Sequence, residues 1–348
     1  MRKLASVQRI TEITPIKEAD NIETASVLGW KSVIRKQDNF QAGDLIVFVE
    51  IDSLFPPMLP EPFRDLEGKK VKTRIMRGQI SQGIVLPLSI LEESLAHYPR
   101  DIFEGDDVSD LLEIVKYELP MYDNSGSKTK GDFPSFIPKT DEVRIENMTE
   151  YLATLKEEPL KCYITEKIDG TSITFYLNEG VFGVCSRNRD LLETPSCMYW
   201  KVAREFHIEE KMRRNNDINI AIQGELYGEG IQGNPLKMKG KHVRFFSVYS
   251  IDMKKFYPFY SFQHTIVNLL GLYTVPVIDV DYELTNDIED VKQLTMNRRS
   301  HLAPLQGAEG IVLRPMHETY HPLFETAGQA GRVSMKAINP QYLLAHNL

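Results

Sequence analysis

Short alternating runs of apolar and polar residues, separated by turns, dominate the first part of the chain. Residues 25–51 and 71–88 contain β-branched runs of this kind, and residues 44–50 form the clearest strand, directly after Gly43. Prolines then interrupt regular structure, at Pro56, Pro57, Pro60 and Pro62. The pattern predicts a small β-barrel, which we place at residues 1–115.

A stretch rich in Gly, Ser, Pro and charge at residues 123–139 indicates a linker, placed at residues 116–138, before a second domain at 139–348. Strands are expected there at residues 162–165, 172–177, 181–186, 219–226, 243–251, 310–314 and 332–336. Helices are expected at residues 195–214, with Thr194 as N-cap, and at 287–301, with Asn286 as N-cap. Strands and helices that do not alternate strictly favour the α+β class over a doubly wound parallel sheet.

Composition adds limits on the class of protein. The 348 residues, 42% hydrophobic and 26% charged, are those of a globular chain with two domains. A net charge of −8 does not support non-specific nucleic-acid binding, so a nucleic acid would be held locally. No run resembles a signal peptide or a membrane span, and three cysteines do not suggest a disulfide framework. We expect an intracellular protein, cytoplasmic or nuclear, with no membrane partner.

Residues 165–171, TEKIDGT, contain the first candidate for chemistry. Lys167 lies between a β-rich run and a glycine turn, with the carboxylate of Asp169 two residues on. A lysine amine attacks phosphorus only when deprotonated, so we expect its pKa to be lowered by cations, a metal or burial. Taken alone, the segment fits a surface lysine in a hairpin turn better than a nucleophile. The order of the segments that follow carries more weight: CSRN at 185–188, QGELYG at 223–228, RFFSVY at 244–249, EGIVLR at 309–314 and SMK at 334–336.

In this order the segments resemble motifs I, Ia, III, IIIa, IV and V of the covalent nucleotidyltransferases, the polynucleotide ligases and mRNA capping enzymes. The resemblance implies an α+β nucleotidyltransferase (adenylation) domain with antiparallel sheets, in which Lys167 becomes adenylated. By the same resemblance Glu166 contacts adenine, and Phe246 stacks on the base. The residues that hold ribose and phosphates would be Arg187, Asn188 and Glu225. Phe245 and Phe246 must face opposite ways in a regular strand, so one of them is expected in the core.

The resemblance also assigns the groups that manage charge. It implies that Asp169, Glu225 and Glu309 arrange Mg²⁺ or Mn²⁺, and that Lys336 neutralises the α-phosphate of ATP. Many ligases have two lysines in the last motif, whereas Ser334 occupies the first position here. These residue types suit nucleotidyl transfer, which needs alignment and electrostatic stabilisation from the protein.

The type of ligase is suggested by what surrounds these motifs. Only residues 338–348 follow the last motif, which leaves no room for the C-terminal OB-fold domain of DNA ligases and capping enzymes. The preceding β-domain resembles the N-terminal OB module of one RNA-ligase type, and residues 138–147 resemble its linker region, where Arg144 would approach the ATP phosphates. The resemblance thus implies an ATP-dependent RNA ligase of RNA repair. It would join 3′-OH and 5′-phosphate RNA ends, including nicked duplex, through lysyl-AMP and RNA-adenylate, and we expect a monomer.

Two basic groups are candidates for RNA contact, and each also fits a solvated charged loop. They are Lys237, Lys239, Lys241 and Arg244 in the second domain, and Lys69, Lys70, Lys72, Arg74 and Arg77 in the first. Two alternatives stay open at this point. One is a DNA nick ligase or another nucleotidyltransferase, such as one that caps with GTP. The other is an RNA-binding protein with an inactive ligase domain.

Overall fold

The structure, a computed structural model, describes residues 3–117, 127–214, 218–327 and 331–348. The chain divides into two compact units. The first contains Met1–Pro120, Ile145–Ala153 and Pro340–Leu348, and the second contains Met121–Arg144 and Thr154–Asn339. Each unit therefore consists of segments that are not consecutive in the chain, so a single boundary position cannot divide the two units.

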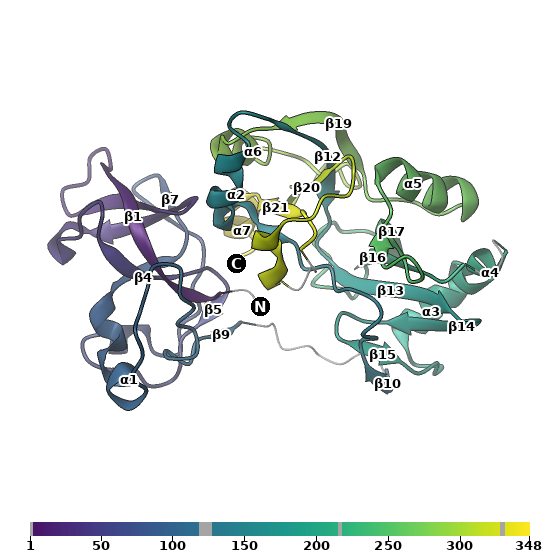
Figure 1. The fold of residues 1–348 in the computed structure, drawn as a ribbon, viewed down its shortest axis with the longest axis horizontal. Coiled ribbons are helices and arrows are strands. Elements are labelled where there is room, and N and C mark those ends of the chain that lie inside the picture. The colour runs from purple at the N-terminus through teal and green to yellow at the C-terminus, as the bar shows by residue number, and fades with distance from the viewer. Residues whose placement is uncertain (1–2, 118–126, 215–217, 328–330) are drawn as a thin grey trace. The chain divides into compact units, whose positions relative to one another are not determined.

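The first unit is built on a five-stranded antiparallel sheet in the order β3-β2-β1-β4-β8, which curls into an OB-like half-barrel (Figure 1). The predicted N-terminal OB-like fold is confirmed. Its main strands are β1 (Ala5–Pro15), β2 (Ile22–Val27), β3 (Trp30–Arg35), β4 (Leu45–Val49) and β8 (Ile84–Pro87). Smaller elements are β5 (Ser53–Leu54), β6 (Arg74–Met76), β7 (Gln79–Ser81), α1 (Glu92–His97), β9 (Val115–Lys116) and α7 (Pro340–Ala345).

The second unit contains two sheets, in the orders β10-β15-β14-β13-β16-β17-β18 and β11-β21-β20-β12-β19. The first comprises β10 (Thr129–Asp132), β13 (Thr171–Asn178), β14 (Val181–Cys185), β15 (Arg189–Leu191), β16 (Ile220–Gly228), β17 (Lys241–Ser250) and β18 (Lys255–Phe256). The second comprises β11 (Val143–Arg144), β12 (Leu160–Lys167), β19 (Val277–Leu284), β20 (Gly310–Pro315) and β21 (Met335–Ile338). All pairs are antiparallel except β11 with β21. The predicted α+β class with antiparallel sheets is confirmed.

The helices depart from the sequence predictions. Residues 195–214, expected as one helix, contain two helices, α3 (Met198–Glu205) and α4 (Ile208–Arg213). They are separate because His207 between them has a left-handed backbone, φ 52°. The helix expected at 287–301 ends at Gln293 (α6, Ile288–Gln293), and its N-cap is Asp287, not Asn286. The other helices are α2 (Thr149–Thr154) and α5 (Phe259–Gln263), which a π-helical turn (His264–Leu269) extends.

Aromatic and aliphatic side chains fill the core of the second unit. Phe175 and Phe245 from the larger sheet pack with Trp200 of α3 and Phe262 of α5 in one continuous cluster. Burial on this scale stabilises the sheet that presents the candidate active site, since burying one large apolar side chain contributes about 1.5–3 kcal/mol. Among the described residues, no helix has the length and apolar character needed to cross a membrane.

Candidate active site

Lys167 is the last residue of β12, where the strand meets the turn 168–170. On the next strand its neighbour is Gly310, and there an added Cβ would lie 2.2 Å from the Ala337 carbonyl oxygen. Lys336 lies on the same face of the sheet, because Lys336 pairs with Val312, two residues from Gly310. Arg144, in the neighbouring strand β11, pairs with Lys336. The strand register therefore places Lys167, Lys336 and Arg144 on one face, as a shared nucleotide site requires.

The Lys167 ammonium donates to both carboxylate oxygens of Glu309, at 2.7 Å each. Burial alone lowers the pKa of Lys167, but Glu309, Glu225 and Asp169 together outweigh it, so the pKa is raised. Among the protein's own groups, the carboxylates thus act against the expected lowering of the Lys167 pKa. The raised pKa favours the protonated form of Lys167, which becomes a nucleophile only when the attraction of these carboxylates is reduced.

Glu225 and Asp169 complete a set of carboxylates around Lys167. Burial raises the pKa of Glu225 to about 8; the charge of Lys167 opposes this, and Glu309 and Asp169 add to it. Gly170, between Asp169 and β13, lets the turn approach β16 closely, since a Cβ there would lie 2.4 Å from the Leu226 carbonyl oxygen. The glycine of the TEKIDGT segment thus brings the nucleophile strand against the strand that carries Glu225.

Phe246 occupies a β-bulge in β17. The pairing with β16 shifts between Gln223, opposite Ser247, and Gly224, opposite Phe245, so Phe246 is the extra residue. Phe245 is 1% exposed in the core, whereas Phe246 is partly buried and packs against a small cluster that includes Ile168 and Tyr227. The expectation that one of the two phenylalanines belongs to the core is confirmed. Bulges commonly redirect a side chain next to an active site.

Glu166, which is 2% exposed, is held by the loop 298–308. The Ser300 hydroxyl donates to one of its carboxylate oxygens, and the His301 amide donates to the other at 2.8 Å. Two backbone bonds close this loop as a small hairpin: Ser300 N to the Gln306 carbonyl oxygen at 3.1 Å, and Ala308 N to the Arg298 carbonyl oxygen at 3.0 Å. The hairpin leads directly into Glu309, so a single segment contacts both Glu166 and Lys167.

The structure gives Arg187 and Asn188 different neighbours. Both lie in the exposed turn between β14 and β15, where Arg187 donates to Asp141 at 2.6 Å and Asn188 accepts from Lys139 at 3.1 Å. They are thus tied to the segment just before Arg144. Their roles toward ribose and phosphate stay predictions.

Arg314 is a buried charge that the motif comparison did not single out. Its guanidinium is 2% exposed and donates to Glu142 at 2.6 Å, to the Ser334 hydroxyl at 3.0 Å and to the Phe246 carbonyl oxygen at 3.4 Å. It also lies 5.6 Å from the centroid of the Phe246 ring. Arg314 therefore joins three segments of the site. An arginine at the end of an otherwise apolar strand was the available signal in the sequence.

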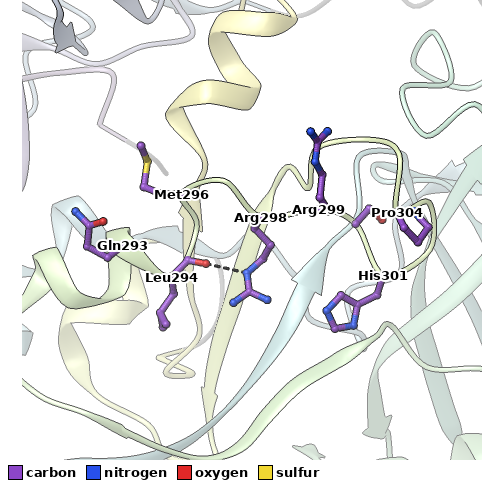
Figure 2. A pocket seen from close by; sticks show the side chains of 8 residues that line it. Gln293, Leu294, Met296, Arg298, Arg299, His301 and Pro304 are labelled. Carbon is purple, nitrogen blue, oxygen red and sulfur yellow. Dashed lines mark hydrogen bonds between the residues drawn. The ribbon is translucent and has the colours of Figure 1, made fainter.

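An open pocket of about 560 Å³ lies on the loop after α6 (Figure 2). Its lining includes Ser300 and His301, and the rest is Gln293, Leu294, Met296, Arg298, Arg299 and Pro304. The first unit has a smaller hollow, of about 390 Å³, lined by Lys69, Lys70, Lys72, Thr73, Arg74 and Asn347. There Lys70 stacks over Tyr117, and burial lowers its pKa more than Asp52 raises it.

Fold and site together define the nucleotidyltransferase class of ligases, since a strand-end lysine among carboxylates lies on a sheet face with a second lysine. An RNA ligase family model matches residues 160–338, and an OB-fold domain model matches residues 4–88. The chain belongs to the RNA ligase family. This confirms the predicted family and the prediction that the protein is a ligase.

Solved structures of Naegleria gruberi RNA ligase resemble the whole chain. A mutant form with ATP and manganese is 33% identical, with a TM-score of 0.86 and 100% coverage of both chains. The form with pyrophosphate is 34% identical, with a TM-score of 0.84 and coverage of 100% of this chain and 99% of that one. A mutant with AMP and manganese is 33% identical, with a TM-score of 0.84 and 99% coverage of both. No curated protein sequence matches the chain. The predicted use of ATP and a divalent cation agrees with these structures.

Proposed function

We propose that this chain is an ATP-dependent RNA ligase that joins 3′-OH and 5′-phosphate RNA ends through lysyl-AMP and RNA-adenylate. The observation that carries the proposal is the position of Lys167, at a strand end and 2.7 Å from both oxygens of Glu309. Clustering three partly buried carboxylates around one amine costs desolvation free energy, so such a cluster usually serves chemistry. We place the protein in an intracellular compartment, cytoplasmic or nuclear, where its three buried free cysteines stay reduced.

Different residues would contribute to different steps of enzyme adenylylation. Lys167 first loses a proton to solvent, and neutralisation of Glu309 and its neighbouring carboxylates by a cation would lower the Lys167 pKa and favour that loss. The Lys167 amine then attacks the α-phosphorus, and pyrophosphate leaves. Lys336 and Arg144, on the same sheet face, would stabilise charge on the phosphate oxygens.

Phe246 would support the adenine ring, and Glu166 would contact the base edge. The bulge leaves Phe246 partly exposed, and the loop at Ser300 keeps the Glu166 carboxylate in place beside Lys167. Arg187 and Asn188 would contact ribose and phosphates. AMP then passes to the RNA 5′-phosphate, and the 3′-hydroxyl displaces AMP to seal the strand.

Asp169, Glu225 and Glu309 would hold the divalent cation, Mg²⁺ or Mn²⁺. Within the described residues, no group of three or more His, Cys, Asp and Glu side chains forms a ready-made metal site. Proteins commonly bind magnesium through one or two carboxylates together with substrate phosphates, so the triphosphate would supply the remaining ligands. When bound, the cation would neutralise the carboxylates that now raise the Lys167 pKa, and would balance charge on the triphosphate.

The test is covalent labelling by α-³²P-labelled ATP or GTP with Mg²⁺ or Mn²⁺. Lys167→Ala should abolish the labelled protein band. Lys161→Ala, an exposed lysine on the same strand, should leave it intact. A band with ATP only, passed on to seal a nicked RNA duplex, supports the proposal. A band with GTP alone, or sealing of DNA but not RNA, would point to the other nucleotidyltransferases, and no band at all would favour an inactive, RNA-binding domain.

A further inference from the structure

The open pocket of about 560 Å³ carries positive charge without acidic partners. Arg298 and Arg299 line it with His301, and none of the lining residues is an Asp or Glu. Arg298 donates its Nε to the Leu294 carbonyl oxygen at 2.8 Å, and Arg299 donates one Nη to the Leu305 carbonyl oxygen at 3.3 Å. In the part of the chain that the structure describes, neither arginine forms an ion pair.

The chain as a whole is acidic, with a net charge of −8, so this pocket differs in charge from the protein as a whole. Guanidinium groups match phosphate in geometry and charge, and they lose less hydration on binding than an ammonium does. An electropositive pocket in an acidic protein therefore favours a phosphate-bearing ligand.

The arrangement favours an extended polyanion over a small one. Figure 2 shows the side chains of Arg298 and His301 on one side of the loop and Arg299 directed away on the other. The pocket is open, so its cations do not converge on a single enclosed phosphate. A strand with phosphates in succession can pair with both arginines, whereas one phosphate cannot.

We propose that this pocket, built on Arg298 and Arg299, is a subsite for the phosphodiester backbone of the RNA substrate. The inference rests on the proposed function and names a contact for it. Because Ser300 and His301 of the same hairpin hold Glu166, RNA bound here would lie on the segment that also positions the residue before Lys167. The hairpin bonds at Arg298 and Ser300 make this support rigid.

The experiment compares Arg298→Gln/Arg299→Gln and Arg299→Gln with a control that removes two exposed lysines elsewhere in the unit, Lys254→Gln/Lys255→Gln. Affinity for a fluorescent nicked RNA duplex is measured by anisotropy over a salt series, and labelling with α-³²P-ATP is followed without RNA. Each lost phosphate contact should reduce the salt slope of the affinity by about one. We expect the double variant to lose about two units of slope and about tenfold in affinity at low salt, with labelling changed less than twofold.

RNA affinity and slope equal to those of the lysine control would overturn the proposal. Slower labelling with unchanged RNA affinity would also overturn it, because the pocket would then serve the phosphates of ATP. Thermal melting checks that each variant folds, and the exposed Arg299 single variant keeps the test valid if loss of the Arg298 bond to Leu294 destabilises the loop. Absence of labelling in the wild type would refute the proposed function, while the anisotropy would still decide whether RNA occupies the pocket.

Discussion

Removing the buried guanidinium of Arg314 should destabilise the second unit and weaken its nucleotide site. Arg314→Met leaves Glu142, whose side chain is 14% exposed, without its 2.6 Å partner and removes the bonds to Ser334 and to the Phe246 backbone. Breaking a buried pair by deleting one partner costs about 3–5 kcal/mol, because the other charge stays buried. We therefore expect the free energy of unfolding to fall by about that amount.

A second variant distinguishes the free-energy cost of an unpaired buried charge from the cost of lost packing. Arg314→Met/Glu142→Leu replaces both charges by apolar side chains of similar length, a change that is often neutral or even stabilising. The double variant should recover more than half of the lost stability. Its affinity for ATP should stay low, because the Phe246 bulge has still lost the bond to Arg314.

The assay must report the second unit alone. The chain has two tryptophans, Trp30 in the first unit and Trp200 in α3 of the second. In a Trp30→Phe background, urea unfolding followed by fluorescence monitors Trp200. A loss below about 1 kcal/mol for Arg314→Met, or a double variant no more stable than the single one, would refute the reasoning that a stranded carboxylate carries the cost.

Three further predictions test other parts of the site. Ser300→Ala removes the hydrogen bond to one carboxylate oxygen of Glu166. Since a hydrogen bond to a charged group contributes about 1.5–3 kcal/mol, the KM for ATP in the labelling assay should rise about tenfold, and the preference for ATP over GTP should fall. An unchanged KM would contradict this role. Glu225→Gln removes a carboxylate whose pKa is raised to about 8, so wild-type stability should fall as the pH rises from the unfolded-state value near 4.5 through about 8. The variant should be relatively more stable across that window and lose ligation, and a stability difference independent of pH would argue against it. Gly170→Ala places a methyl group 2.4 Å from the Leu226 carbonyl oxygen, so labelling should be lost and the melting temperature should fall, whereas normal labelling would show that the turn can move.

The strands of the second unit that are compact apolar or β-branched runs could be predicted from the sequence. Not predicted were β19 (Val277–Leu284) and the short strands β10, β11, β15 and β18. The expected strand at 219–226 is β16 (Ile220–Gly228), and that at 243–251 is β17 (Lys241–Ser250). The last strand begins later than expected, at Met335, where Arg332–Ser334 had been included. Arg332 instead pairs with Glu318 at 2.6 Å, a contact with the preceding loop that alternation cannot reveal.

Helix ends could not be predicted where tertiary contacts compete with helical propensity. Residues 294–301 had a helical pattern after Asp287, yet they leave the helix. Asn297 has a left-handed backbone, φ 53°, and Ser300 bonds to Glu166, more than a hundred residues earlier. A single-sequence pattern contains no information on such a partner, so the hairpin that supports the site was assigned to a helix.

The departure at Ser334 becomes intelligible only in the structure. The residue occupies the position where many ligases have a first lysine, and its hydroxyl accepts a hydrogen bond from Arg314. A lysine there would place a second cation beside a guanidinium that is 2% exposed and has one carboxylate partner, Glu142. Because two buried cations cannot share one carboxylate without a large desolvation cost, Ser334 and Arg314 are best understood as a matched pair. Lys336, one pleat further along β21, then remains the lysine on the face that carries Lys167.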